Sequence, residues 1–358
     1  MTVHADVVIV GAGVAGLSLA AALAPSREVV ILEAEAQIAR HSSGRSARQM
    51  QPSYGPAHIR ELTRRSIDLI RGMEAEDGVE ILSPRALGWV ARESGLDALE
   101  GRLADNPTLR RLDSREIAEA LPLADPEIYR AAAVDEFAFE VAVERLLDAY
   151  LRRALRGGAE LFTGARVDGI VFRSGLWEAR TASGDYAAPV LVDAAGAWAD
   201  RIASLAGVAP RGILSYRRTV VVTEPIEGRE LGAAPMISDV EGDFYARPEA
   251  GGLLLSPSDE EPVEPSDAPV DPAVVDELLA RAAERLACEV PPVSRSWAGL
   301  RCFSRQAVPI SGWDPLAPGF AWLAGQGGYG LQTSAALAED TARAIVEGAA
   351  RSSTEREA

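Results

Sequence analysis

The chain has 358 residues and a formal net charge of -17, because 53 acidic side chains outnumber 36 basic ones. This length favours about two domains, and a charged fraction of 25% is typical of a folded globular protein. An acidic surface repels phosphate backbones and anionic lipids, which argues against binding to nucleic acids or membrane surfaces. Two cysteines and three histidines, without a CxxC pair, are too few for a disulfide framework or a zinc site. We therefore expect a soluble, cytoplasmic protein without a metal.

Residues 7–24 contain no charged side chain, and these 18 residues approach the length of a membrane-spanning helix. Three glycines that directly follow the β-branched run VVIV divide the segment differently. They predict a strand at 6–10, a turn and a helix at 14–23, and a second apolar strand at 29–33 completes a βαβ unit. No basic region precedes the run as it does in a signal peptide. We expect neither a transmembrane segment nor a signal peptide.

The rest of the chain alternates between helical and strand patterns, around an irregular polar loop at 41–55 that is typical of a functional segment. Helices are predicted at 56–73, 114–121, 141–156 and 273–287, and from the glycines at 327–330 to about 346. Strands are predicted at 88–91, 159–163, 166–173, 176–181, 190–192, 218–223, 243–247, 252–255, 295–301, 307–311 and 320–324. Residues 256–272, with five prolines and six acids, are predicted to form a solvated loop.

Nucleotide-type βαβ patterns lie at both ends and in the middle of the chain, with antiparallel-type strands between them. We therefore predict an α/β protein of two interleaved domains. A nucleotide-binding domain is expected from 1–80, 141–215 and 303–350, a substrate domain from 81–140 and 216–302, and a flexible tail from 351–358.

The glycines after the first strand form a GxGxxG motif between a strand and a helix. Gly11 permits a tight turn, Gly13 lets the backbone approach a pyrophosphate, and Gly16 permits close packing of helix and strand. Glu33 ends the second strand about 20 residues later, where a carboxylate accepts the ribose hydroxyls of a dinucleotide and disfavours NADP. The motif predicts a dinucleotide site that suits NAD or FAD, and a glycine-rich turn without a nucleotide is the alternative.

Two further glycine-rich turns bear on the choice of cofactor. DAAGAW at 193–198 follows a strand, and GQGGYGLQT at 325–333 opens the terminal helix. Backbone N–H groups at such a helix start would stabilise an electron-rich flavin edge, which favours FAD. The alternative is that these glycines only cap a helix.

These segments carry a family resemblance. VIVGAGVAGLSLA, HSSGRSA, VDAAGAWAD, FYARPEAGGLLLSP, SWAGLR and GQGGYGLQTSAA, in this order, resemble the FAD-dependent D-amino-acid oxidase superfamily of glycine and sarcosine oxidases, in particular the bacterial D-arginine dehydrogenases. The similarity extends from the N-terminus to about residue 346. It implies non-covalent FAD in a Rossmann-type domain and an antiparallel-sheet substrate domain facing the flavin. The cofactor-binding residues it implies are Gly11, Gly13, Val14, Ala15, Gly16, Glu33, Ser43, Gly44, Arg45, Ser46, Val167, Ala195, Gly196, Trp198, Gly327, Gly328, Tyr329, Gly330, Leu331, Gln332 and Thr333.

The resemblance also implies five catalytic residues around the substrate, namely Tyr54, Arg218, Tyr245, Arg301 and Gln332. A guanidinium can bind a carboxylate bidentately, and tyrosine hydroxyls add donors without adding charge. Taken alone, either arginine would more often be a surface ion-pair partner, and it is the motifs SYRRT and WAGLR that favour the site. Arg217 is the adjacent alternative to Arg218 and points to the other face of a strand.

The implied reaction is oxidation of a D-amino acid by hydride transfer from Cα to flavin N5, giving an imino acid that hydrolyses to a 2-oxo acid and ammonia. The electron acceptor that reoxidises the flavin is left open between a quinone, a carrier protein and oxygen. Two alternatives remain. One is oxidation of a secondary amine of the sarcosine, proline or opine type, or of a 2-hydroxy acid, and the other is a non-catalytic nucleotide-binding subunit.

The sequence differs from the D-arginine enzymes at the positions that are expected to surround the side chain of the substrate. Gln49, Met50 and Gln51 replace a histidine, a tyrosine and a threonine, and Leu87 stands where those enzymes carry the glutamate that meets the guanidinium. We therefore expect an apolar or small substrate side chain, in a pocket of Gln49, Met50, Leu87 and Trp89, because an unpaired guanidinium is costly to desolvate. Cys302 does not align with the flavin-linked cysteine of sarcosine oxidases, and a buried thiol without a covalent bond to FAD is predicted.

Overall fold

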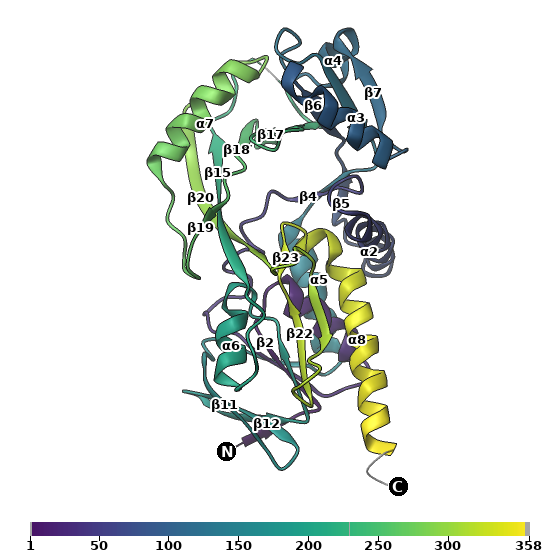
Figure 1. The fold of residues 1–358 in the computed structure, drawn as a ribbon, viewed down its shortest axis with the longest axis vertical. Helices are drawn as coiled ribbons and strands as arrows, with labels where there is room; N and C mark the ends of the chain where they lie inside the picture. The colour runs from purple at the N-terminus through teal and green to yellow at the C-terminus, as the bar shows by residue number, and fades with distance from the viewer. Residues whose placement is uncertain (1, 229, 355–358) are drawn as a thin grey trace.

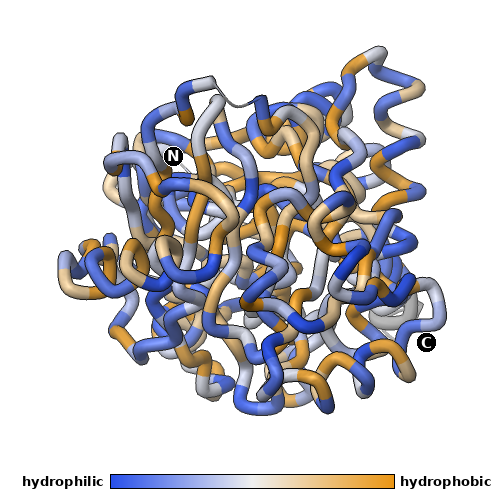
Figure 2. Tube along the Cα trace, turned by 90° about the horizontal axis from the view of Figure 1, so that it is seen from above, coloured by the Kyte–Doolittle hydropathy of each residue, from blue (hydrophilic) through white to orange (hydrophobic). Residues whose placement is uncertain are grey.

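The computed structural model describes residues 2–228 and 230–354 and has two halves, each built around one large β-sheet (Figure 1). The two termini lie in the same half, where the long helix α8 (Gly330–Thr354) runs along one side. In the peripheral helices hydrophobic and hydrophilic residues alternate along the coil, as Figure 2 shows, which is the pattern of helices that bury one face. Among the described residues, no helix is both long enough and apolar enough to cross a membrane.

The first sheet has six strands that are parallel except for β21 at one edge. Its spatial order is β10 (Glu160–Phe162), β3 (Val29–Leu32), β2 (Val7–Val10), β14 (Val190–Asp193), β22 (Phe320–Ala324) and β21 (Ile310–Trp313). The sequence predicts all six of these strands, and the four central ones, β3, β2, β14 and β22, are continuously apolar because they are parallel and buried on both faces.

Successive side chains of the central strands pack against different layers, as the period of two requires. Val7 and Ile9 of β2 join an apolar core with α1 (Val14–Leu23), α5 (Val143–Arg156) and α8, which α2 (Ala57–Asp77) extends. Val8 and Val10 face a second core against α6 (Ala199–Leu205) and a small sheet. The strands of this small sheet are β1 (Thr2–His4), β13 (Gly184–Ala188), β12 (Leu176–Thr181) and β11 (Val167–Arg173).

The second large sheet has ten strands and forms the other half. Its main path is β23 (Gln326–Gly327), β20 (Val293–Phe303), β15 (Leu214–Thr223), β18 (Gly252–Ser256), β17 (Tyr245–Glu249), β16 (Met236–Asp239), β6 (Leu87–Ala91), β8 (Ala131–Asp135) and β7 (Arg110–Asp113), with β19 (Glu261–Pro262) on β15. The pairs are antiparallel except β16 with β6. The strand β23 directly precedes α8 and thus connects this sheet to the first half.

Helices cover one face of the ten-stranded sheet, and the other face carries the cavity described below. The helices α4 (Ser114–Ala120) and α7 (Pro272–Arg285) pack on the first face. The helix α3 (Leu96–Asp105) packs on the second face, beside the apolar cluster that contains Trp89 and Tyr245. A three-stranded sheet of β4 (Gln49–Met50), β9 (Phe139–Val141) and β5 (Leu82–Pro84) and the short helices η1 (Glu93–Gly95) and η2 (Gly196–Trp198) complete the fold.

Several expectations from the sequence need correction. The loop 256–272 is not simply solvated, because β19 pairs with β15 and Asp267 forms ion pairs with Arg40 and Arg45. The terminal helix continues to Thr354 instead of ending near 346, so 351–354 are helical, and residues 355–358 of the expected tail lie outside the described residues. Helix α3 and the strands β8 and β16 were not predicted, because their apolar runs are short or alanine-rich.

Candidate active site

The turn between β2 and α1 has the geometry that its glycines suggest. Gly11 has a φ of +108°, and a Cβ on Gly16 would lie 1.9 Å from the carbonyl oxygen of Gly11. The backbone N–H of Val14 at the start of α1 donates to the hydroxyl of Ser43 at 2.9 Å, so the HSSGRSA loop closes over the helix N-terminus. Larger side chains at Gly11 and Gly16 would therefore force the turn apart from the elements packed against it. The positive end of the α1 dipole faces the place where a pyrophosphate would lie.

Glu33 follows β3 and is held by the backbone around it. Its Oε2 accepts a hydrogen bond from the Ala12 N–H at 2.8 Å, and its Oε1 accepts one from the Glu35 N–H at 2.9 Å. The carboxylate lines a cavity of about 180 Å³, the smaller cavity below. Each carboxylate oxygen can accept more than one hydrogen bond, so Glu33 can still accept ribose hydroxyls.

A larger cavity of about 550 Å³ adjoins the smaller one, and both are lined by Gly13, Ser42, Ser43, Ala194 and Gly196. Together they run from Glu33, past the start of α1, to the face of the ten-stranded sheet. Buried amide groups without a hydrogen-bond partner among the described residues lie along the larger cavity, at Gln49 and Gln326. An elongated site with a nucleotide-binding turn at one end and free amide groups at the other fits FAD.

The predicted cofactor residues divide between these cavities. The larger cavity is lined by Val14, Ala15, Arg45, Ser46, Gly327, Gly328, Gly330, Leu331 and Gln332, the smaller by Gly11, Glu33, Val167, Ala195 and Trp198, and both by Gly13, Ser43 and Gly196. Four lie behind the walls, namely Gly16, Gly44, Tyr329 and Thr333. Gly16 and Gly44 pack against backbone carbonyls, and the Thr333 hydroxyl donates to the Tyr329 carbonyl at 2.9 Å. These four residues shape the site without facing it.

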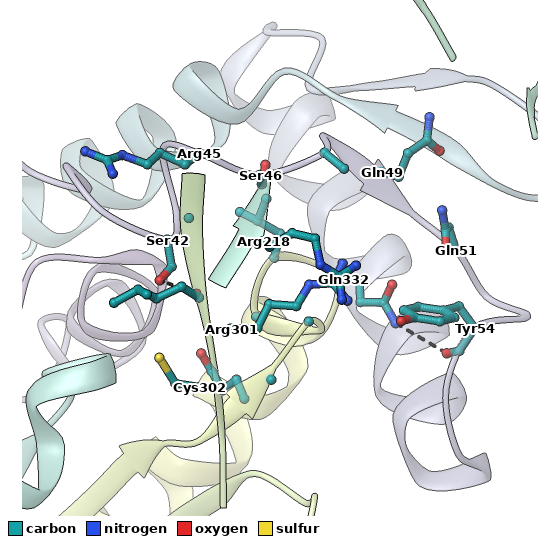
Figure 3. Close-up of a pocket in the computed structure, with 18 of the residues that line it drawn as sticks. Ser42, Arg45, Ser46, Gln49, Gln51, Tyr54, Arg218, Arg301, Cys302 and Gln332 are labelled. Carbon is teal, nitrogen blue, oxygen red and sulfur yellow. Dashed lines mark hydrogen bonds between the residues drawn. The ribbon is translucent and has the colours of Figure 1, made fainter. Parts of the chain in front are cut away.

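All five predicted catalytic residues line the larger cavity, although they come from five separate stretches of the chain. Figure 3 shows Arg218, Arg301 and Gln332 converging beside Tyr54. The amide of Gln332 donates to the backbone carbonyl of Tyr54 at 3.5 Å. Tyr245 joins them from β17 and is 5% exposed. The geometry therefore brings two guanidinium groups and two phenol groups to one end of the cavity.

The two arginines are in different states. The Arg218 Nε donates to the Asp259 carbonyl at 2.9 Å, and its Nη2 forms an ion pair with the Glu260 carboxylate at 2.9 Å. No carboxylate of the described residues forms an ion pair with Arg301. Burial and the nearby Arg301 lower the pKa of Arg218. Burial also acts to lower the pKa of Arg301, but Tyr54, Tyr245 and the Glu260 carboxylate together outweigh it, so that this pKa is raised.

The neighbouring Arg217 points away from the cavity, as strand alternation requires. Its guanidinium forms an ion pair with Glu261 on β19. This pair helps to hold the acidic segment 256–272 against β15.

The predicted side-chain pocket is only partly present. Gln49, Gln51 and Trp89 line the larger cavity, but Met50 and Leu87 are fully buried and do not. Met50 alternates with its neighbours along β4 and points into the core under the six-stranded sheet.

Leu87 lies in the apolar cluster of the ten-stranded sheet. It is paired in register with Met236, which lines the cavity in its place. Met50 and Leu87 are therefore core residues. They do not contact a substrate in this cavity, so they no longer support the expectation of an apolar substrate side chain.

Two groups close to this end have raised pKa values because they are buried. The pKa of the Cys302 thiol is raised to about 11, and that of the Tyr329 hydroxyl to about 12, with a further contribution from Tyr54. The Cys302 side chain lies 3.7 Å from the Ser215 hydroxyl. Both groups are protonated at neutral pH, and a thiol in this state is a poor nucleophile.

Sequence reasoning missed five charged residues of the larger cavity, Arg48, Arg102, Asp239, Glu241 and Glu260, of which Arg102 on α3 and Glu260 beside Arg218 matter most for the substrate end. Arg102 lies in an unpredicted helix, and Glu260 lies in the segment interpreted as a solvated loop. The SDE sequence at 258–260 begins two residues after the end of β18, and this closeness to a strand is a local sign that its acids could fold back.

Comparisons with known proteins agree with this geometry. The DAO family model, described as FAD dependent oxidoreductase, matches residues 6–344. FAD-dependent oxidoreductase domain-containing protein 1 of Xenopus laevis is 26% identical, covering 96% of this chain and 80% of that protein. Human mitochondrial dimethylglycine dehydrogenase is 27% identical over 71% of this chain, which spans only 30% of that longer protein. L-proline dehydrogenase from P. horikoshii has the same fold, with a TM-score of 0.86, 19% identity and coverage of 97% and 95% of the two chains. The chain belongs to the DAO family of FAD-dependent oxidoreductases, and its cofactor is FAD.

Proposed function

We propose that the protein oxidises an amino acid or a carboxylate-bearing amine at the carbon next to nitrogen. The observation that carries this proposal is Arg301, whose guanidinium lines the larger cavity with Tyr54 and Tyr245 and forms no ion pair with a carboxylate of the described residues. A desolvated guanidinium attracts a carboxylate and can bind both of its oxygens. The substrate carboxylate would complete this site.

The side chains of the cavity bind and orient the substrate. Arg301 and the two tyrosines would fix the carboxylate, and the buried walls would exclude water from the reacting carbon. Each carboxylate that lines the larger cavity is already paired with an arginine, namely Asp239 and Glu241 with Arg92 and Glu260 with Arg218. No histidine lines it among the described residues.

A free general base is therefore not available in the described part of the cavity, and the substrate amine must enter the reaction already neutral. When bound, FAD supplies the acceptor for the hydride that leaves the substrate carbon.

A D-amino acid is the first candidate, with the imino acid product hydrolysing to a 2-oxo acid and ammonia. The D configuration is supported by the sequence resemblance. An N-substituted amino acid is the second candidate, and the names of two similar proteins, the proline and dimethylglycine dehydrogenases, support it. A 2-hydroxy acid would satisfy the same carboxylate site. A cytoplasmic location stays a prediction, which cell fractionation tests.

Anaerobic reduction of the flavin separates these candidates. The purified holoprotein is mixed with D-amino acids, their L enantiomers, N-methyl amino acids and 2-hydroxy acids, and the loss of the flavin absorption band is followed. We expect bleaching by a D-amino acid, by an N-substituted amino acid or by both. Bleaching by hydroxy acids alone would contradict the proposal, and no bleaching by any compound would favour the non-catalytic subunit. Reoxidation by air with formation of peroxide, or by a quinone or a carrier protein, then identifies the electron acceptor.

A further inference from the structure

Besides Arg218 and Arg301, the larger cavity is lined by Arg45, Arg48 and Arg102, and of these three only Arg102 forms no ion pair among the described residues. Arg102 belongs to the last turn of α3, and its guanidinium carbon lies 3.7 Å from the centre of the Trp89 ring. Trp89 is 3% exposed and donates from its indole N–H to the Ser53 hydroxyl at 3.1 Å. The ring is thus fixed, and a guanidinium stacked on it has a defined position with its edge free for a ligand.

Arg102 lacks the partner that such a group normally has. Its Nε is buried without a hydrogen-bond acceptor, and no carboxylate of the described residues forms an ion pair with it. Nearby arginines on β7 differ, because Arg110 pairs with Glu116 and Glu136, and Arg111 pairs with Glu100. The chain has 53 acidic residues, yet none of those described forms an ion pair with this half-buried guanidinium. A partly desolvated charge of this kind is stabilised when an anion binds to it.

Arg102 and Arg301 lie at the same group of aromatic rings. The Tyr54 ring centre is 5.9 Å from that of Trp89, which carries Arg102, and 5.2 Å from that of Tyr329. Tyr54 and both arginines line the same cavity. One ligand in this cavity can therefore reach two guanidinium groups that lack acidic partners.

We propose that Arg102 binds a second anionic group of the substrate, so that the preferred amino acid or amine carries two carboxylates. This inference rests on the proposed function, and it replaces the apolar side-chain pocket expected from Met50 and Leu87. Arg301 binds the first carboxylate, and the second carboxylate binds at the edge of the Arg102 guanidinium, which stacks on Trp89. A neutral or apolar side chain would leave Arg102 desolvated and unpaired, and this cost opposes its binding.

Matched pairs of compounds test the proposal in the unmodified holoprotein. Iminodiacetate is compared with sarcosine, and D-aspartate with D-asparagine, by the concentration that gives half the maximal rate of anaerobic flavin reduction. We expect this concentration to be about 30-fold lower for the diacid of at least one pair, the effect of one charge-assisted hydrogen bond. Equal values within both pairs would overturn the proposal.

The variant Arg102→Met removes the charge and keeps an apolar side chain over Trp89. We expect it to abolish the preference for the diacid by raising the half-saturating concentration of the diacid, without raising that of sarcosine or D-asparagine. Arg111→Met is the matched control, because it removes an exposed arginine close to α3 and should preserve the preference. A variant that weakens diacid and monoacid equally would show a structural role only and would overturn the proposal.

Binding without turnover separates this inference from the proposed function. Malonate and acetate are titrated into the oxidised holoprotein, and the shift of the flavin absorption band gives their dissociation constants. We expect malonate to bind about 30-fold more tightly than acetate, with the difference lost in Arg102→Met. If no amine reduces the flavin but this difference persists, the proposed function is wrong and the anion site at Arg102 stands. Equal binding of malonate and acetate would overturn the anion site.

Discussion

Replacement of Arg301 by methionine is the most direct test of the carboxylate site. Methionine keeps an unbranched apolar stem, but the substrate loses the one guanidinium of the catalytic set that forms no ion pair among the described residues, since Arg218 is paired with Glu260. Two charge-assisted hydrogen bonds at the lower end of their range amount to about 3 kcal/mol. We therefore expect the half-saturating substrate concentration in anaerobic flavin reduction to rise about a hundredfold.

The control for this variant is Arg295→Met, on the same strand β20. Arg295 is exposed and pairs with Glu249, so its loss should change the half-saturating concentration by less than about twofold. Both variants should keep the flavin absorption band and the unfolding temperature of the parent protein. A rise of less than about threefold in Arg301→Met, with FAD still bound, would refute the assignment of the substrate carboxylate to Arg301.

The other predictions concern the ion pair at the cavity, the cofactor turn, the thiol and pH. Glu260→Gln frees Arg218, so the half-saturating concentration should fall about threefold or more, and a rise would contradict a competing ion pair. Gly16→Ala should prevent FAD retention because its Cβ has no room, whereas Gly72→Ala, with open space around it, should leave FAD content unchanged and stabilise α2 by up to about 1 kcal/mol in thermal unfolding. Acid precipitation should release all of the flavin into the supernatant, because the pKa of the Cys302 thiol is raised to about 11 by burial, and flavin in the pellet would be evidence against non-covalent binding. The rate at low substrate concentration should rise with pH as the substrate ammonium group loses its proton, and identical profiles for two substrates of different ammonium pKa would show that a protein group titrates instead.

The cofactor end could be predicted from the sequence because its geometry is local. Gly11, Gly13 and Gly16 lie within one turn between a strand and a helix, so their spacing alone fixes where the backbone can approach a phosphate. Glu33 ends the adjacent parallel strand, and the register of β3 on β2 then determines its place. The four central strands of this sheet were predicted for a similar reason, since burial on both faces leaves a continuous apolar run that can be recognised without knowing the neighbouring strands.

The substrate end needed the tertiary structure, because it is assembled from segments that approach one another only in the folded chain. Whether Met50 or Gln49 faces the cavity depends on how β4 is placed in the fold. Because side chains alternate along the strand, Gln49 and Gln51 line the cavity and Met50 points into the core. The sequence by itself identified the family and the dinucleotide turn, and through the family resemblance it predicted Arg218 and Arg301, which the fold brings to one cavity. Only the fold decided that Glu260 neutralises Arg218 and that Arg102 reaches the cavity unpaired, because ion pairing depends on distances across the chain that no local pattern encodes.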